Sequence, residues 1–164
     1  MSQPLFTAQD ALAWHEHTAT AWRRALADDP AILTLPCTVA KTKTTGELLQ
    51  HIVAVELRYA ERLNGLPASD YSIIAYDTVD ALYATHDRAT ELLRQALDAD
   101  LDWETEIEFV TRMMGPARAT PKTIFFHAIF HSMRHYAQLA TIIREHGRAI
   151  SIYGDYLIMG LKPV

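Results

Sequence analysis

Four stretches of this sequence repeat apolar residues every three or four positions, and this spacing defines one face of an α-helix. They cover residues 8–27, 44–65, 78–99 and 121–146. Helix-start signals precede two of them: Thr44 with Glu47 three positions later, and Thr120 directly before Pro121. Amphipathic helices bury their apolar faces against one another. We therefore expect an all-α protein with the architecture of a four-helix bundle.

The segment 100–119, between the third and fourth predicted helices, has no helical period. Residues 103–110 alternate well enough for a short strand, and Gly115-Pro116 indicates a turn. We expect a short irregular or hairpin segment here. The tail around 153–160 is expected to add one short helix. The length of 164 residues suits one domain, and we expect residues 1–164 to form a single domain.

Composition excludes several classes of protein. At 164 residues, of which 49% are hydrophobic, the chain can bury one substantial core. A net charge of −5 without a basic cluster argues against a nucleic-acid-binding surface. No apolar run approaches the ~18 residues of a membrane span, and the first residues do not resemble a signal peptide. The single cysteine, Cys37, excludes an internal disulfide. We expect a cytoplasmic protein that binds neither nucleic acid nor membranes.

Three histidines recur at intervals of four residues in the last predicted helix: His127, His131 and His135. Each step of four residues rises about 6 Å and turns about 40° beyond one full turn, so the three imidazoles lie on one stripe. Apolar residues share that stripe, which places it toward the interior, where an imidazole without a partner is costly. Two histidines at i and i+4 on a helix are a standard chelating pair for a metal.

A mononuclear metal site needs a third ligand from elsewhere in the chain. His51, at the edge of the apolar stripe of the second predicted helix, is the best-placed candidate. Neutral imidazole suits zinc, nickel, iron or copper. The alternative is a cluster of hydrogen-bonded core histidines without a metal. Spacing alone leaves both interpretations open.

The remaining histidines have simpler interpretations. His15 shares the apolar stripe of the first predicted helix and could approach a central site, whereas His17 and His86 are expected to be solvated. His146 lies in a last helical turn, where it favours the helix dipole. Cys37 is expected to be a small buried hydrophobic residue, with a thiol near the site as the alternative.

Two polar residues near the predicted ligands have open roles. Glu56 follows His51 by five residues, about 140° around the helix, which is unfavourable for binding the same metal. It is either a hydrogen-bond partner between helices or a solvated surface glutamate. Gln138, one turn after His135, is a candidate partner of an imidazole or of a substrate.

Both motif helices resemble those of the DinB/YfiT-like family. In 45–65 a hydrophobic lead precedes His51, a glutamate follows five residues later, and the helix ends in Leu-Asn-Gly. The stretch 131–147 is similar to the family pattern His-x-x-x-His-Arg-Gly-Gln, an apolar run, Arg and Gly. Tyr136-Ala137 stands in place of the usual Arg-Gly. The resemblance covers both helices and the tail Gly154-Asp-Tyr-Leu, and the helix count agrees over nearly the whole chain.

The resemblance implies that residues 1–164 are one DinB-like metal-binding bundle. Carried over by position, it makes His51, His131 and His135 the ligands of a divalent metal and leaves His127 outside the ligand set. It implies zinc or nickel as the metal, and a homodimer. Some family members resemble transferases or isomerases that use low-molecular-weight thiols.

Two functions from different classes remain open. The first is a metal-dependent enzyme with a small-molecule substrate, in which the metal activates a low-molecular-weight thiol, as in an S-transferase or isomerase, or water, as in a hydrolase. The second is a non-catalytic metal-binding or structural helical bundle that dimerises. The sequence identifies neither the reaction nor a catalytic residue.

Overall fold

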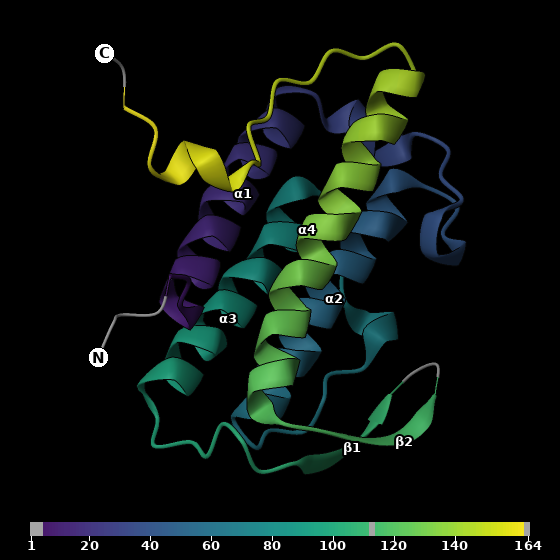
Figure 1. The fold of residues 1–164 in the computed structure, drawn as a ribbon. Coiled ribbons are helices and arrows are strands. Elements are labelled where there is room, and N and C mark those ends of the chain that lie inside the picture. Colours follow the sequence, from purple (N-terminus) through teal and green to yellow (C-terminus); the bar gives the residue numbers. More distant parts are fainter. Residues whose placement is uncertain (1–4, 112–113, 163–164) are drawn as a thin grey trace.

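The structure is a computed structural model that describes residues 5–111 and 114–162, so both ends of the predicted domain 1–164 lie outside it. Within these residues the chain is mostly helical, with four long α-helices near the predicted positions and one small sheet (Figure 1). The helices are α1 Ala8–Asp28, α2 Thr45–Leu63, α3 Val79–Asp98 and α4 Pro121–Glu145. Short 3-10 helices are η1 Pro30–Thr34, η2 Val39–Lys41, η3 Tyr71–Ile73 and η4 Tyr156–Met159.

All four α-helices begin after a threonine that caps the first turn. The hydroxyls of Thr7, Thr44, Thr78 and Thr120 each accept a hydrogen bond from the backbone N–H three residues later. This bond satisfies a donor that the helix itself leaves unpaired. The start signals at Thr44 and Thr120 are therefore confirmed. The Glu47 carboxylate accepts from the backbone N–H of Lys43, one residue before the cap.

The connection between α2 and α3 sets the direction in which α3 runs relative to the other helices. It runs back along α2, because Ser69 donates to the Glu61 carboxylate near the end of that helix, and Gln50 near its start donates to the carbonyl of Ile74. Consequently α3 begins beside the start of α2 and runs in the same direction, while α1 and α4 run the other way (Figure 1). The α2 helix packs against α3 and α4, and α1 packs against the same two helices.

The segment between α3 and α4 forms the hairpin that the sequence suggested. Strand β1 Ile107–Thr111 pairs antiparallel with β2 Gly115–Ala119. The predicted position of the turn was wrong: Gly115 and Pro116 are the first two residues of β2, opposite Thr111 and Val110. Gly115 has a φ of +71°, which glycine adopts without strain, and this allows the strand to start directly after the turn.

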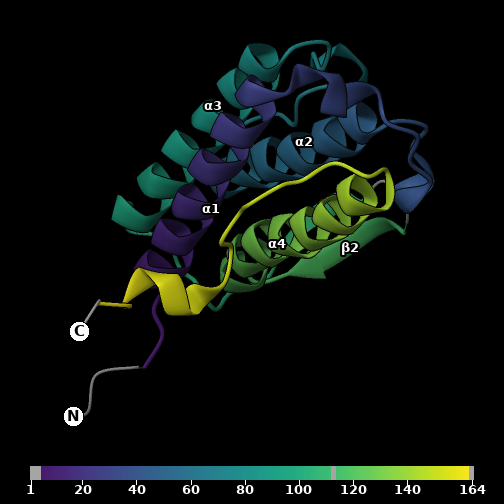
Figure 2. The same cartoon turned by 90° about the horizontal axis from the view of Figure 1, so that it is seen from above.

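The tail after α4 crosses back over α1 (Figure 2). The indole N–H of Trp14 donates to the carbonyl of Gly154 at 2.7 Å, and the Trp14 and Tyr156 rings meet edge to face. The expected short helix is η4. No helix in the described part of the chain is both long enough and apolar enough to cross a membrane.

Candidate metal centre

The structure brings together the three histidines that the sequence singled out as ligands. His51 comes from α2, and His131 and His135 come from successive turns of α4. One ligand nitrogen from each lies within 4.8 Å of the others. Ring centroids are 4.8 Å apart for His51 and His131, 5.0 Å for His51 and His135, and 4.4 Å for His131 and His135. This spacing allows one ion to contact all three rings after small side-chain movements.

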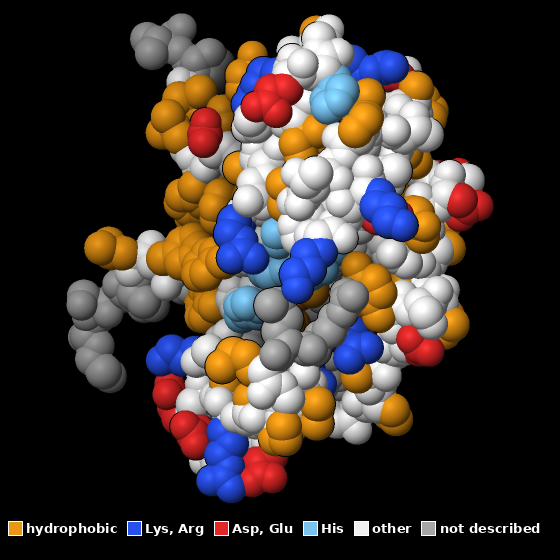
Figure 3. All heavy atoms as spheres, turned by 90° about the vertical axis from the view of Figure 1, so that its right-hand side faces the viewer, with side chains coloured by type: hydrophobic (Ala, Val, Ile, Leu, Met, Phe, Trp, Pro, Cys, Tyr) orange, Lys and Arg blue, Asp and Glu red, His pale blue; other side chains and the backbone are white. Residues whose placement is uncertain are grey.

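The cluster lies close to the surface on one side. His131 and His135 are buried, whereas His51 is half-buried. On the side of the molecule where α2, α4 and the strands lie, histidine side chains reach the surface near the middle of the face, among Lys and Arg side chains (Figure 3). Within the cluster, His51 is the side chain that is partly exposed to solvent.

Burial keeps the imidazoles of His131 and His135 neutral at physiological pH, because it lowers the pKa of both. Burial, together with the neighbouring His135 and His51, lowers the pKa of His131 from 6.5 to about 2. Burial also lowers the pKa of His135, although its hydrogen bond to Gln138 acts in the opposite direction. A neutral imidazole keeps a nitrogen lone pair free, which is the form that binds a metal.

Gln138 and Arg134 fix the tautomer of His135. The Gln138 carbonyl oxygen lies 2.7 Å from His135 Nδ1, and this oxygen can only accept, so Nδ1 carries the proton. The Nε2 atom then presents its lone pair, and Arg134 Nη2 donates to it at 3.2 Å. Gln138 thus has the role of an imidazole partner, one of the two roles that the sequence left open. A partner of this kind orients a ligand ring and sets its basicity.

His127 lies one turn before His131, at the outer end of the stripe. Its ring is 5.4 Å from the His131 ring and 5.1 Å from the Tyr59 ring, and its side chain is exposed. It is not part of the group of donor atoms that meet within 4.8 Å. Its position fits the expectation that His127 is a neighbour of the site.

A second group of donors lies deeper, between α1, α2 and α3. Glu56 is 1% exposed, and its carboxylate oxygens lie 3.0 Å from His15 Nε2 and 2.8 Å from His86 Nδ1. The His15 and His86 rings stack with centroids 5.2 Å apart. Glu56 is therefore the inter-helix partner, and the solvated alternative is wrong. The expectation that His86 is solvated is also wrong, because this residue is 5% exposed.

A spacing signal for this second group was present in the sequence. His86 follows Leu82 by four residues and precedes Ala89 by three, so it continues the buried row of α3. Glu56 occupies the same kind of position between Ile52 and Ala60 on α2. Polar residues in a buried row need partners, and this rule predicts a hydrogen-bond partner for each of them without identifying it.

The other predicted positions are less informative for the site. His17 is exposed, and the His146 ring lies at the end of α4 with Nδ1 2.9 Å from the carbonyl of Ile142. Cys37 is 5% exposed and lines an open cavity of about 430 Å³ together with Gln138. Because Gln138 also contacts His135, this cavity lies next to the three-histidine cluster.

The chain belongs to the DinB family, whose sequence model matches residues 1–157 of 164. This confirms the resemblance seen in the two motif helices. No curated protein matches the chain. The chain is thus a mostly helical member of this family, and its described residues include two groups of side chains that could hold a metal ion.

The metal-free protein should lose stability as the pH falls from about 6.5 to 4. Burial lowers the pKa of His15 from 6.5 to about 4, against the opposing effect of Glu56. In this range the unfolded chain binds a proton at residue 15 and the folded chain does not, which favours unfolding by up to roughly 3 kcal/mol. His131 acts in the same direction. The pKa of His86 is raised, so its contribution is complete below 6.5 and is lost only at higher pH.

Urea unfolding at a series of pH values, in the presence of a chelator, measures this dependence. The His15→Gln variant should show a flatter slope between pH 6.5 and 4, and the exposed control His17→Ala should keep the wild-type slope. An equally steep slope for His15→Gln would contradict the assignment.

Proposed function

We propose that His51, His131 and His135 hold one divalent metal, zinc or nickel, and that the protein is a metal-dependent enzyme. The metal would activate a low-molecular-weight thiol, in an S-transferase or isomerase reaction, or water, in a hydrolase reaction. The convergence of three donor nitrogens within 4.8 Å carries this proposal. We place the site in a DinB-like four-helix bundle that comprises residues 1–164 as one domain.

The residues present fit a metal. All three donors are imidazoles, the pKa values of His131 and His135 are lowered, and the buried Nδ1 of His131 has no hydrogen-bond partner among the described residues. A divalent ion held by three neutral imidazoles retains its charge and an open position, and it lowers the pKa of a thiol or water bound there. Gln138 would hold the His135 ring so that Nε2 faces this position.

Arg134 supports a substrate that carries negative charge. Its guanidinium donates to His135 Nε2, the nitrogen that a metal would use, and must turn away when that lone pair is occupied. It would then stand free beside the site as a cation that attracts and orients a thiolate or carboxylate. The neighbouring cavity of about 430 Å³, lined by Cys37 and Gln138, offers space for the rest of a small molecule.

Replacing Gln138 by leucine should weaken metal affinity by roughly 10- to 100-fold, because the His135 ring loses the group that fixes its tautomer and orientation. Competition with a chromogenic chelator measures the affinity. The matched control is Thr141→Val, which lines the same cavity without contacting the imidazole. Equal affinities for the two variants would contradict this role of Gln138.

The activity is tested by metal analysis and a substrate panel. The purified protein, loaded with zinc or with nickel, is assayed with low-molecular-weight thiols of different charge against an aryl halide, and with ester substrates for hydrolysis. Turnover that disappears on chelation and returns on adding the metal supports the enzyme. A metal-loaded protein without turnover across both panels contradicts it and favours a metal-binding bundle without catalysis.

We further propose that the protein is a homodimer, as the family resemblance implies, and that it is located in the cytoplasm, which its single cysteine fits. Sedimentation velocity at micromolar concentration is expected to give a species of twice the chain mass. A species of one chain mass at this concentration would contradict the dimer.

A further inference from the structure

The group His15, Glu56 and His86 has the composition of a metal site. Its three donors come from three helices, α1, α2 and α3, and one donor atom of each lies within 4.8 Å of the others. Two histidines with one carboxylate form a recurrent ligand set for divalent iron, manganese and zinc. All three side chains belong to the buried core, so their positions are fixed by packing.

The contact between His15 and Glu56 lacks the geometry of a hydrogen bond. His15 Nε2 and Glu56 Oε1 lie 3.0 Å apart, yet both atoms are buried and neither has a hydrogen-bond partner among the described residues. Two ligand atoms bound to one metal at about 2.1 Å each are separated by roughly 3.0 to 3.4 Å, depending on the angle between them. The separation thus matches that of two neighbouring ligands of one metal.

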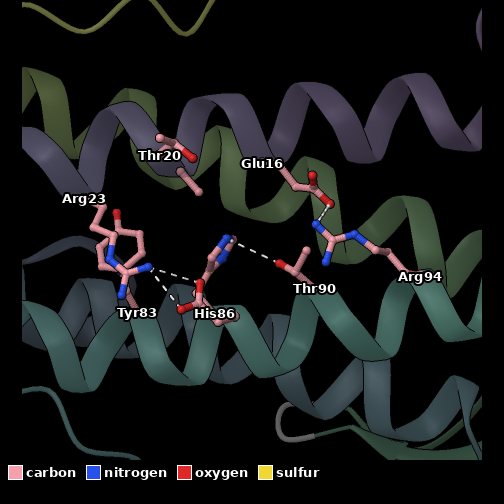
Figure 4. Close-up of a pocket in the computed structure, with 9 residues that line it drawn as sticks. Glu16, Thr20, Arg23, Tyr83, His86, Thr90 and Arg94 are labelled. Atoms are coloured by element: carbon pink, nitrogen blue, oxygen red, sulfur yellow. Dashed lines mark hydrogen bonds and ion pairs between the residues drawn. The ribbon is translucent and has the colours of Figure 1, made fainter.

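A cleft leads from the surface toward this group (Figure 4). It lies between α1 and α3, has a volume of about 260 Å³ and includes His86 in its wall. Figure 4 shows His86 in the middle of the cleft, with Arg23 and Arg94 on opposite sides. Each arginine is paired with a carboxylate, Arg23 with Asp87 and Arg94 with Glu16. These pairs neutralise the positive charge that would otherwise repel an incoming cation.

We propose that His15, Glu56 and His86 form a second divalent-metal site, separate from the three-histidine cluster and reached through the cleft between α1 and α3. The Glu56 carboxylate neutralises part of the ion's charge. The His15 side chain is 1% exposed, so packing holds its imidazole in the core beside this carboxylate. Residues 51 and 56 lie about 140° apart around α2, so this helix contributes one side chain to each site.

To test the second site by itself, the three-histidine site is removed by mutation. The full-length protein and the double variant His131→Ala/His135→Ala are stripped with a chelator and then titrated with zinc alone. Native mass spectrometry counts the bound ions in the folded population only, so unfolded molecules do not appear as lost binding. We expect about two ions per wild-type chain, about one per chain in the double variant, and about none when Glu56→Gln is added.

Further variants test whether the ion in the double variant is bound by the proposed ligands. Glu56→Gln keeps the shape of the side chain but removes its charge, and His17→Ala removes an exposed histidine from α1. The double variant with His17→Ala should still bind about one ion. Folded double-variant chains without zinc would overturn the second site, as would an ion that survives both Glu56→Gln and His15→Ala. One ion per wild-type chain together with none in the double variant would contradict only the second site. One ion per chain in both proteins would contradict only the first site.

Discussion

Replacing His135 by alanine should weaken divalent-metal binding at the three-histidine site by at least about 100-fold. A structural zinc contributes on the order of 10 kcal/mol or more through its full ligand set, so one lost ligand removes several kcal/mol. The helices should persist, because each carries its own buried apolar face. Metal content by mass spectrometry and helicity by circular dichroism, measured on the same sample, give the two quantities.

The matched control is His127→Ala, which removes the neighbouring histidine one turn earlier on the same helix. His127 is exposed and lies outside the group of converging donors, so this variant should bind the metal with nearly wild-type affinity. Undiminished binding in His135→Ala would refute the site. An equal loss in the two variants would show that His127 belongs to the ligand set, contrary to the proposed site.

Replacing Glu56 by alanine should lower the free energy of unfolding of the metal-free protein by about 3–5 kcal/mol. The carboxylate is the shared partner of His15 and His86, and all three side chains are buried. Burial raises the pKa of Glu56, but the two histidines outweigh this effect and lower it, so the group is charged at neutral pH. Removing the carboxylate leaves His86 Nδ1 without its hydrogen-bond partner in the core. Urea unfolding in the presence of a chelator measures the loss.

Two further variants test whether the loss arises from the buried network. Glu91→Ala, at an exposed position on α3, should change the unfolding free energy by less than about 0.5 kcal/mol. Glu56→Gln retains an oxygen that can accept from His86 Nδ1, so its loss should be smaller than that of Glu56→Ala. A loss below about 1 kcal/mol for Glu56→Ala would contradict the role of this network in stability.

The sequence predicted the helices because their signals are local. The apolar period acts within one or two turns and placed α1 to α4 close to their observed bounds, and the caps at Thr44 and Thr120 marked the starts of α2 and α4. The turn of the hairpin was misplaced because Gly115-Pro116 can either form a turn or start an edge strand directly after one. Only the pairing with Thr111 and Val110, a contact between strands, decides between the two.

The three-histidine cluster was predictable only in part, because only two of its members lie on the same helix. His131 and His135 share one helix face, so their proximity follows from the helical repeat. His51 lies 80 residues before His131 in the sequence, and only the packing of α2 against α4 brings its ring within 4.8 Å. Spacing made it the best candidate, and the family motif made it a predicted ligand.

By itself the sequence determined where the helices begin and end and which face of α4 carries imidazoles, because both depend on the geometry of a single helix. Tertiary structure alone decided that His15, Glu56 and His86 meet. They lie on three helices, and although the apolar rows mark each position as buried, only the packing of these helices decides which side chains face one another. A buried carboxylate is stable only with partners, and those partners are supplied by neighbouring helices rather than by neighbours in the sequence.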